Sequence, residues 1–209
     1  HYYYDMEIRN TMSDIKTSII IYDWDDTIIP TTYIRTYKKL SKQYKDSLKY
    51  IQRDVFNIVN QCMLLHRIQY IVTNSQGKWV AECLRRFFPK CSRFIMKYVK
   101  IISASDNYYY KYPDNPYEWK RRAIKHIINK TRKQTDNNID IISLGDAKND
   151  RNIIIKFGEE IPNIHVKHVK FMESPSPAML SKELELFLSN LIFLHNLKTN
   201  VDFKLVITT

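Results

Sequence analysis

Three carboxylates follow directly after an apolar segment near the start of the chain. Residues 19–22 are continuously apolar, and Asp23, Asp25 and Asp26 come immediately after them. Acids packed at the end of a buried strand repel one another, and their desolvation is costly unless a cation or hydrogen bonds compensate. Oxygen ligands of this kind suit Mg²⁺, so a magnesium site is the natural inference. The alternative is a cluster of acids that caps the turn before a helix beginning after Pro30.

The spacing of the acids suggests different tasks for them. Alternate side chains of a strand point to the same side, so Asp23 and Asp25 are expected at one locus. Asp23 is then placed to act as a nucleophile. Asp26 alternates away from that locus and is expected to cap the following turn.

A second apolar run, residues 70–72, ends in Thr73 and Asn74. Their hydroxyl and amide groups could bind a phosphoryl oxygen, although Thr-Asn is also an ordinary helix cap. Lys120 opens a helical pattern farther along the chain, where an ammonium group could neutralise both a nucleophile and a phosphate. Lys125 competes for this role, but it lies one turn inside the pattern, so we favour Lys120.

A third apolar run, residues 141–144, leads through Gly145 to Asp146 and Asp150. Two acids therefore lie on the turn after an apolar strand. Their position makes both of them candidate metal ligands, and Asp146 is the stronger of the two.

Hydrophobic patterning predicts the elements that position these residues. Short runs rich in β-branched residues predict strands at 18–22, 69–72, 101–103, 139–144 and 165–171. Helical stripes run from Tyr37 to Cys62, from Trp79 to Phe88, from Ala123 to Ile128 and onward from Pro177. This alternation predicts an α/β fold with a Rossmann-like, doubly wound and mostly parallel sheet. Residues 105–119, rich in Tyr, Asn and Pro, are expected to form a surface loop.

The residues at these strand ends resemble the four motifs of the haloacid dehalogenase superfamily. The first motif is matched by Asp23-Trp24-Asp25-Asp26-Thr27, and Thr73, Lys120 and Gly145-Asp146 with Asp150 follow in the order of the other three. The resemblance covers about residues 17 to 155. Its first motif is the most specific, whereas the second and third are single residues that gain weight from their order.

The resemblance implies a magnesium-dependent phosphatase. Asp23 would attack phosphorus to give an aspartyl-phosphate, and Asp25 would protonate the leaving oxygen and later activate water. Thr73 and Lys120 would hold the phosphoryl group. An acid at position 25, which can shuttle protons, favours a phosphatase over a dehalogenase.

The same resemblance implies a ligand set for Mg²⁺. The ion would be bound by Asp23, by the backbone carbonyl of Asp25 and by Asp146. Asp150 would either coordinate directly or lie in the outer coordination shell.

The lengths of the connections bear on the substrate. Neither the segment between Thr27 and Thr73 nor that between Thr73 and Lys120 is expected to form a cap domain. The resemblance implies that minimally capped members have open sites, and that many act on macromolecules such as phosphoproteins or nucleic-acid ends, or recruit a partner that covers the site. The aromatic residues within 105–119 are expected either to form a recognition surface or to pin the loop by packing on one another.

Composition sets broad limits. Hydrophobic residues make up 44% of the 209 residues, which predicts a globular chain. The length favours one domain over residues 1–209, with 1–16 as an extension or cloning remnant. No apolar run approaches the roughly 18 residues of a membrane span. Three cysteines without a CxxC pair favour an intracellular, reducing compartment, with the cytoplasm expected. The net charge of +11 favours a phosphorylated or otherwise acidic partner and points only weakly to nucleic acid.

Two functions of other classes remain open. A response-regulator-like receiver also combines acids, Thr and Lys on a doubly wound sheet, but its phosphoacceptor lies farther along the chain. A catalytically silent binding or regulatory module could retain the fold without the chemistry. The intact acid pair Asp23 and Asp25 argues against such a module.

Overall fold

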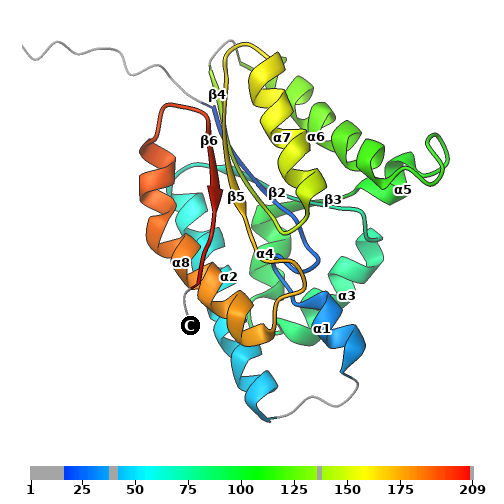
Figure 1. Ribbon diagram of the computed structural model, residues 1–209, viewed down its shortest axis with the longest axis vertical. Helices are drawn as coiled ribbons and strands as arrows, with labels where there is room; N and C mark the ends of the chain where they lie inside the picture. Colours follow the sequence, from blue (N-terminus) through cyan, green and yellow to red (C-terminus); the bar gives the residue numbers. More distant parts are fainter. Residues whose placement is uncertain (1–16, 38–41, 136–137, 208–209) are drawn as a thin grey trace, which may run out of the picture.

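The computed structural model describes residues 17–37, 42–135 and 138–207, and Figure 1 shows their arrangement. Six parallel strands form one sheet in the order β3-β2-β1-β4-β5-β6. The strands are β1 (Thr17–Tyr22), β2 (Ile68–Thr73), β3 (Val99–Ser103), β4 (Ile139–Gly145), β5 (Ile164–Lys170) and β6 (Val201–Lys204). The first five confirm the strands predicted from the sequence, and β6 was not predicted.

Helices cover both faces of the sheet (Figure 1). They are α1 (Thr31–Thr36), α2 (Lys42–Leu64), α3 (Gly77–Phe87), α4 (Ser92–Tyr98), α5 (Ala104–Tyr108), α6 (Pro116–Arg132), α7 (Lys148–Glu160) and α8 (Pro177–Asn196). Buried side chains of α2, α3, α4 and α8 pack on one face, and those of α6 and α7 pack on the other. The chain therefore has the Rossmann-like, doubly wound α/β fold that the sequence predicts.

Alternation along β1 explains the two hydrophobic cores. Ile20 and Tyr22 point into the core under α2 and α8, whereas Ile19 and Ile21 point into the core under α6 and α7. A strand buried on both faces needs apolar side chains at every position, as a central parallel strand does. This requirement accounts for the continuous apolar run that precedes Asp23.

The order of the strands reverses beside Asp23. From β1 the chain moves to β2 and β3 on one side, then returns to β4 and continues to β5 on the other side. Tyr22 at the end of β1 pairs with Leu144 near the end of β4. In open α/β sheets, ligands bind outside the carboxyl ends of the strands where the order reverses. The acids after β1 and β4 lie at that reversal.

Two helix starts differ from the sequence predictions. The helix predicted to start at Tyr37 does not include this residue, because Tyr37 has an extended backbone at the end of α1. The next described helix is α2 (Lys42–Leu64). Helix α6 begins at Pro116 rather than at Lys120, with Asn115 accepting a hydrogen bond from the Glu118 N–H as its cap.

The stretch 105–119 is also more regular than predicted. Its start belongs to α5 and its end to α6, and in α5 the Ser103 hydroxyl accepts a hydrogen bond from the Asp106 N–H. Local capping by a side chain favours a short helix that hydrophobic periodicity does not reveal.

The connections after β1 and β2 contain helices that pack against the rest of the core. In the described residues between β1 and β2 these are α1 and α2, and α2 packs along α8. Those between β2 and β3 are α3 and α4. Across the described ranges, no helix combines the length and apolar character needed to cross a membrane.

Candidate functional site

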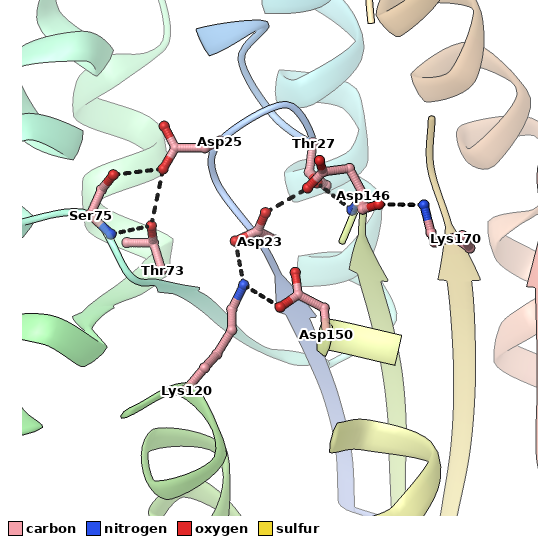
Figure 2. Close-up of polar contacts among 9 residues, drawn as sticks. All are labelled: Asp23, Asp25, Thr27, Thr73, Ser75, Lys120, Asp146, Asp150 and Lys170. Atoms are coloured by element: carbon pink, nitrogen blue, oxygen red, sulfur yellow. Dashed lines mark hydrogen bonds and ion pairs between the residues drawn. The ribbon is translucent and has the colours of Figure 1, made fainter. Parts of the chain in front are cut away.

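Asp23 is the first residue after β1. Its N–H donates to the Leu144 carbonyl oxygen at 3.0 Å, which extends the pairing of β1 with β4 by one residue. The residue is buried, with 7% of its surface exposed. Its Oδ1 atom lies 2.6 Å from the Nζ atom of Lys120, and this contact is drawn in Figure 2. The end of the strand thus presents a carboxylate whose position is fixed by the sheet and by an ion pair.

Lys120 joins two of the acids. Its buried ammonium group lies 2.6 Å from Asp23 Oδ1 and 2.7 Å from Asp150 Oδ1. Burial alone would lower the pKa of Lys120, but the charges of Asp150 and Asp23 raise it, so the side chain stays protonated. Lys125, one turn farther along α6, is exposed. The prediction that Lys120 is the lysine that reaches Asp23 is confirmed.

Asp23, Asp146 and Asp150 form a group that could hold a metal ion. One oxygen from each residue lies within 4.8 Å of the others. Asp146 follows β4, and Asp150 lies in the first turn of α7. The three residues meet because the carboxyl ends of β1 and β4 are neighbours in the sheet.

Gly145 gives Asp150 the space to join this group. A Cβ atom at position 145 would lie 2.9 Å from both the Cβ and Oδ2 atoms of Asp150, closer than such atoms pack. Any side chain at position 145 would therefore displace Asp150. The requirement is one of space, because Gly145 has an ordinary strand backbone.

The charges of the group fit a divalent cation. Two of the three carboxylates contact the one ammonium group of Lys120, and with all three acids ionised the group carries an excess of two negative charges. Burial raises the pKa of Asp23 well above its ordinary value against the effect of Lys120, and the charges of Asp150 and Asp146 raise it further. Burial and the Asp150 charge raise the pKa of Asp146 to about 6. Among the described residues, the shielded Oδ2 atom of Asp150 has no hydrogen-bond partner. An all-oxygen set of this kind suits Mg²⁺ or Ca²⁺.

Thr27 and Lys170 support the carboxylates of the metal group, a role that the sequence did not predict for either residue. The Thr27 hydroxyl accepts a hydrogen bond from the Asp146 N–H at 3.1 Å and lies 3.3 Å from Asp23 Oδ2 and 3.4 Å from Asp146 Oδ1. It has one proton, so it donates to one carboxylate at a time. Lys170, at the end of β5, donates to the backbone carbonyl of Asp146 (Figure 2). Both contacts hold the loop after β4 against its neighbours.

The carboxylate of Asp25 lies apart from this group. Its Oδ2 atom accepts a hydrogen bond from the Ser75 hydroxyl at 2.6 Å and lies 3.5 Å from the Thr73 hydroxyl. Figure 2 shows Asp25 on one side of Asp23 and Asp146 on the other. The expectation that strand alternation brings the side chains of Asp23 and Asp25 to the same locus is therefore wrong.

A turn explains the different direction of Asp25. The strand ends at Tyr22, and the Ile28 N–H donates to the Trp24 carbonyl at 3.0 Å, so the chain has already left the extended conformation. Asp26 has a φ of 55° within this turn. The assignment of the Asp25 backbone carbonyl to a metal stays a prediction.

Asp26 caps α1, as its position predicts. Its Oδ1 atom accepts a hydrogen bond from the Thr32 N–H at 2.9 Å, and its Oδ2 atom accepts one from the Thr32 hydroxyl. The cap interpretation is therefore correct for this one acid of the three.

The end of β2 contributes a set of polar groups opposite Asp25. Thr73 is fully buried, and its hydroxyl accepts a hydrogen bond from the Ser75 N–H at 2.9 Å. Asn74 is half-buried, and its side-chain oxygen has no partner among the described residues. Ser75, which was not identified from the sequence, makes the short contact with Asp25.

The aromatic residues between α5 and α6 mostly pack on one another. The Trp119 indole donates to the Tyr112 carbonyl at 2.6 Å, and the Tyr109 and Trp119 rings lie 5.5 Å apart. Tyr108 packs against the core beneath α6, whereas Tyr110 is 94% exposed. These contacts favour the interpretation of a loop pinned by its own aromatic side chains.

A divalent cation that binds this group, with Mg²⁺ as the probe, is expected to raise the unfolding temperature of the protein. A ligand at a hundred times its Kd stabilises a folded chain by about 2.7 kcal/mol, which corresponds to roughly 5 to 11 °C for a chain of this size. Asp146→Asn should lose most of this shift. Glu159→Gln, which alters an exposed acid near the other end of α7, should keep it. Equal shifts in both variants would contradict the assignment of the metal group.

The pH dependence of this shift follows from the raised pKa values. The folded pKa of Asp146 is about 6 against an ordinary 3.8, so its contribution to stability is fully present below pH 3.8 and is lost as pH rises through about 6. The raised pKa of Asp23 acts in the same direction. The contribution of these two carboxyl groups to the stability of the metal-free protein should therefore fall from about pH 4 to about pH 7. The Mg²⁺ shift should grow over the same window, because the metal binds ionised carboxylates. Thermal unfolding with EDTA and with Mg²⁺ measures both effects.

Comparisons with protein-family models, with curated proteins and with solved structures find no match to this chain. What is established is the arrangement of its own residues. An α/β fold brings a buried Asp23–Lys120 pair and a potential metal-binding group to the point where the strand order reverses.

Proposed function

We propose that this protein is a magnesium-dependent phosphatase of the haloacid dehalogenase type that acts through an aspartyl-phosphate intermediate on Asp23. The observation that carries the proposal is the buried ion pair of Asp23 with Lys120, set against Asp146 and Asp150 at the reversal of strand order. An enzyme of phosphoryl transfer must position its reactants and neutralise their charge, and these residues supply both.

Asp23 is the proposed nucleophile. Lys120 holds one of its oxygens at 2.6 Å, and the backbone N–H of Asp23 is tied to β4, so the carboxylate has little freedom to turn away. A nucleophile fixed in this way has already lost the orientational entropy that a free carboxylate would lose on reaction. Lys120 also places a positive charge where a phosphoryl oxygen would bind, and the Thr73 hydroxyl and the Asn74 amide are proposed as further partners of that oxygen.

The proposed reaction has two displacements. An oxygen of Asp23 forms a bond to phosphorus as the bond to the leaving oxygen breaks, and that oxygen takes a proton from Asp25. A water molecule then attacks phosphorus and gives its proton to Asp25, while the aspartyl oxygen leaves with its electron pair. The products are an alcohol and inorganic phosphate, and both aspartates return to their starting states.

Asp23, Asp146, Asp150 and the backbone carbonyl of Asp25 are the proposed ligands of Mg²⁺. When bound there, the ion would supply positive charge to the phosphoryl oxygens in a buried site. Asp150 is held at 2.7 Å by Lys120, so it links the proposed metal ligands to the group that orients the nucleophile.

The proposed substrate is a phosphate monoester, with a phosphate on a macromolecule favoured. The described connections after β1 and β2 are built of helices that pack against the core and do not form a separate lid. The net charge of +11 suits an acidic partner. The first feature supports a site that is open to a large substrate, and the second supports an acidic substrate.

Hydrolysis of 4-nitrophenyl phosphate with and without Mg²⁺ tests this function. We expect hydrolysis with Mg²⁺ and a loss of at least about a hundredfold in EDTA, because an uncompensated acidic group repels the phosphate. Asp146→Asn should lower the Mg²⁺-dependent rate, and Glu159→Gln should leave it unchanged. No hydrolysis by the wild type at any Mg²⁺ concentration would favour a silent binding module instead.

A further inference from the structure

We propose that Ser75 is a positioning residue that holds the carboxyl group of Asp25 for proton transfer to the leaving oxygen of an alkyl phosphate. This inference rests on the proposed phosphatase function and deepens it. Ser75 lies outside the four motifs, and the leaving group that requires its help is the alkoxide of an alkyl phosphate.

The contacts of Asp25 single out Ser75. The Ser75 hydroxyl lies 2.6 Å from Asp25 Oδ2, whereas the Thr73 hydroxyl lies 3.5 Å from the same atom, at the limit of a hydrogen bond. The Oδ1 atom of Asp25 is shielded from solvent and has no hydrogen-bond partner within the described ranges. The direction of this carboxyl group therefore depends mainly on Ser75.

A serine hydroxyl suits a group that gains and loses a proton. It donates to a carboxylate and accepts from a carboxylic acid, so Ser75 remains a partner in both protonation states of Asp25. A residue that only donates, such as lysine, would oppose the protonated state.

Ser75 also orients Thr73. Its backbone N–H donates to the Thr73 hydroxyl oxygen at 2.9 Å, and this leaves the single Thr73 proton free to donate. If Thr73 donates to a phosphoryl oxygen, its weak contact with Asp25 is lost. Ser75 then becomes the remaining hydrogen-bond donor to Asp25 among the described contacts, so its effect should be greatest when substrate is bound.

The need for a held acid depends on the leaving group. When the bond between phosphorus and an alkyl oxygen breaks, the electron pair remains on an alkoxide, which is strongly basic and requires the proton of Asp25. A 4-nitrophenolate ion is stable without that proton. A loss of position at Asp25 should therefore slow the cleavage of alkyl phosphates far more than that of aryl phosphates, and a dedicated positioning residue points to alkyl phosphates as the natural class.

Ser75→Ala tests the proposal through kcat/KM for glycerol 2-phosphate and for 4-nitrophenyl phosphate. This parameter reports the steps up to phosphoenzyme formation, in which Asp25 acts as the acid. We expect a loss of about tenfold to a hundredfold on the alkyl ester and less than about threefold on the aryl ester, the size expected for one hydrogen bond to a charged group. Ser189→Ala is the matched control, because Ser189 is an exposed serine on α8 that donates to the Glu185 carbonyl.

The isosteric pair Ser75→Thr and Ser75→Val separates the hydroxyl from the shape of the side chain. Threonine should restore the ratio of kcat/KM for the alkyl ester to that for the aryl ester, and valine should give the same loss as alanine. If Ser75→Ala fails to fold, the comparison of threonine with valine still tests the role of the hydroxyl. Equal losses on both esters, no loss, a gain in activity, or a wild type inactive on the alkyl ester would overturn the role of Ser75. A wild type without metal-dependent hydrolysis of either ester would overturn the proposed function as well, so the two failures are distinguishable.

Discussion

Asp23→Asn is expected to lower the turnover of 4-nitrophenyl phosphate by at least about 10⁴-fold, which is roughly 5.5 kcal/mol of activation free energy. The amide has the shape of the carboxylate but is a far weaker nucleophile, so the covalent intermediate cannot form. It also loses the ion pair with Lys120, and this removes the charge that fixes the position of the side chain. Steady-state hydrolysis at saturating Mg²⁺ measures the loss.

Asp25→Asn should behave differently on the same substrate. Its leaving group needs little protonation, so attack by Asp23 can proceed, but the water that hydrolyses the aspartyl-phosphate lacks its base. We expect a burst of 4-nitrophenolate followed by slow turnover. Asp26→Asn is the neighbouring control, because the Asn oxygen can still accept the hydrogen bond from the Thr32 N–H, so this variant should retain both stability and activity. Wild-type turnover in Asp25→Asn would contradict this division of tasks.

Lys120→Met is expected to lower turnover by about 10³-fold, the scale found for removal of a charged group that stabilises a transition state. Methionine fills much of the volume of lysine without its charge. Asp23 and Asp150 would then lose the ammonium group that lies within 2.7 Å of both. Because Lys120 lowers the pKa of Asp23, its removal should raise that pKa further and reduce the fraction of ionised nucleophile.

Lys125→Met is the matched control for Lys120→Met. Lys125 is exposed on the same helix, so its replacement should leave both turnover and unfolding temperature nearly unchanged. A loss of turnover in Lys125→Met comparable with that in Lys120→Met would contradict the role of Lys120. Circular dichroism of both variants separates a loss of chemistry from a loss of fold.

The sequence predicts the core of the fold because central parallel strands are apolar at every position. The run 19–22 has this property and the run 141–144 departs from it only at Ser143, and both lie in strands buried along nearly their whole length. Strand β6 does not have it, since Val201–Lys204 is mostly exposed at the edge of the sheet. An exposed four-residue strand leaves too little hydrophobic pattern to be recognised.

The candidate site is predictable where a residue lies directly at a strand end. Asp23 and Asp146 have this placement, and the parallel pairing of β1 with β4 is sufficient to bring them together. Asp25 and Ser75 do not lie directly at a strand end. They are 50 positions apart in the sequence, and they come into contact because the chain turns after β1 and again after β2. The contact of Lys170 with Asp146 likewise depends on the alignment of β4 with β5. Turn geometry and the relative position of strands come from packing, which residue types alone do not specify.

The most direct test of the proposed chemistry is to trap the phosphoryl group on the protein. Wild-type protein and Asp23→Asn would be mixed with a substrate labelled in its phosphate, quenched rapidly in acid and digested for mass spectrometry. We expect the label on Asp23 in the wild type, more of it in Asp25→Asn, and none in Asp23→Asn. Label retained in Asp23→Asn, or label on another residue of the wild type, would contradict the assignment of Asp23 as the nucleophile.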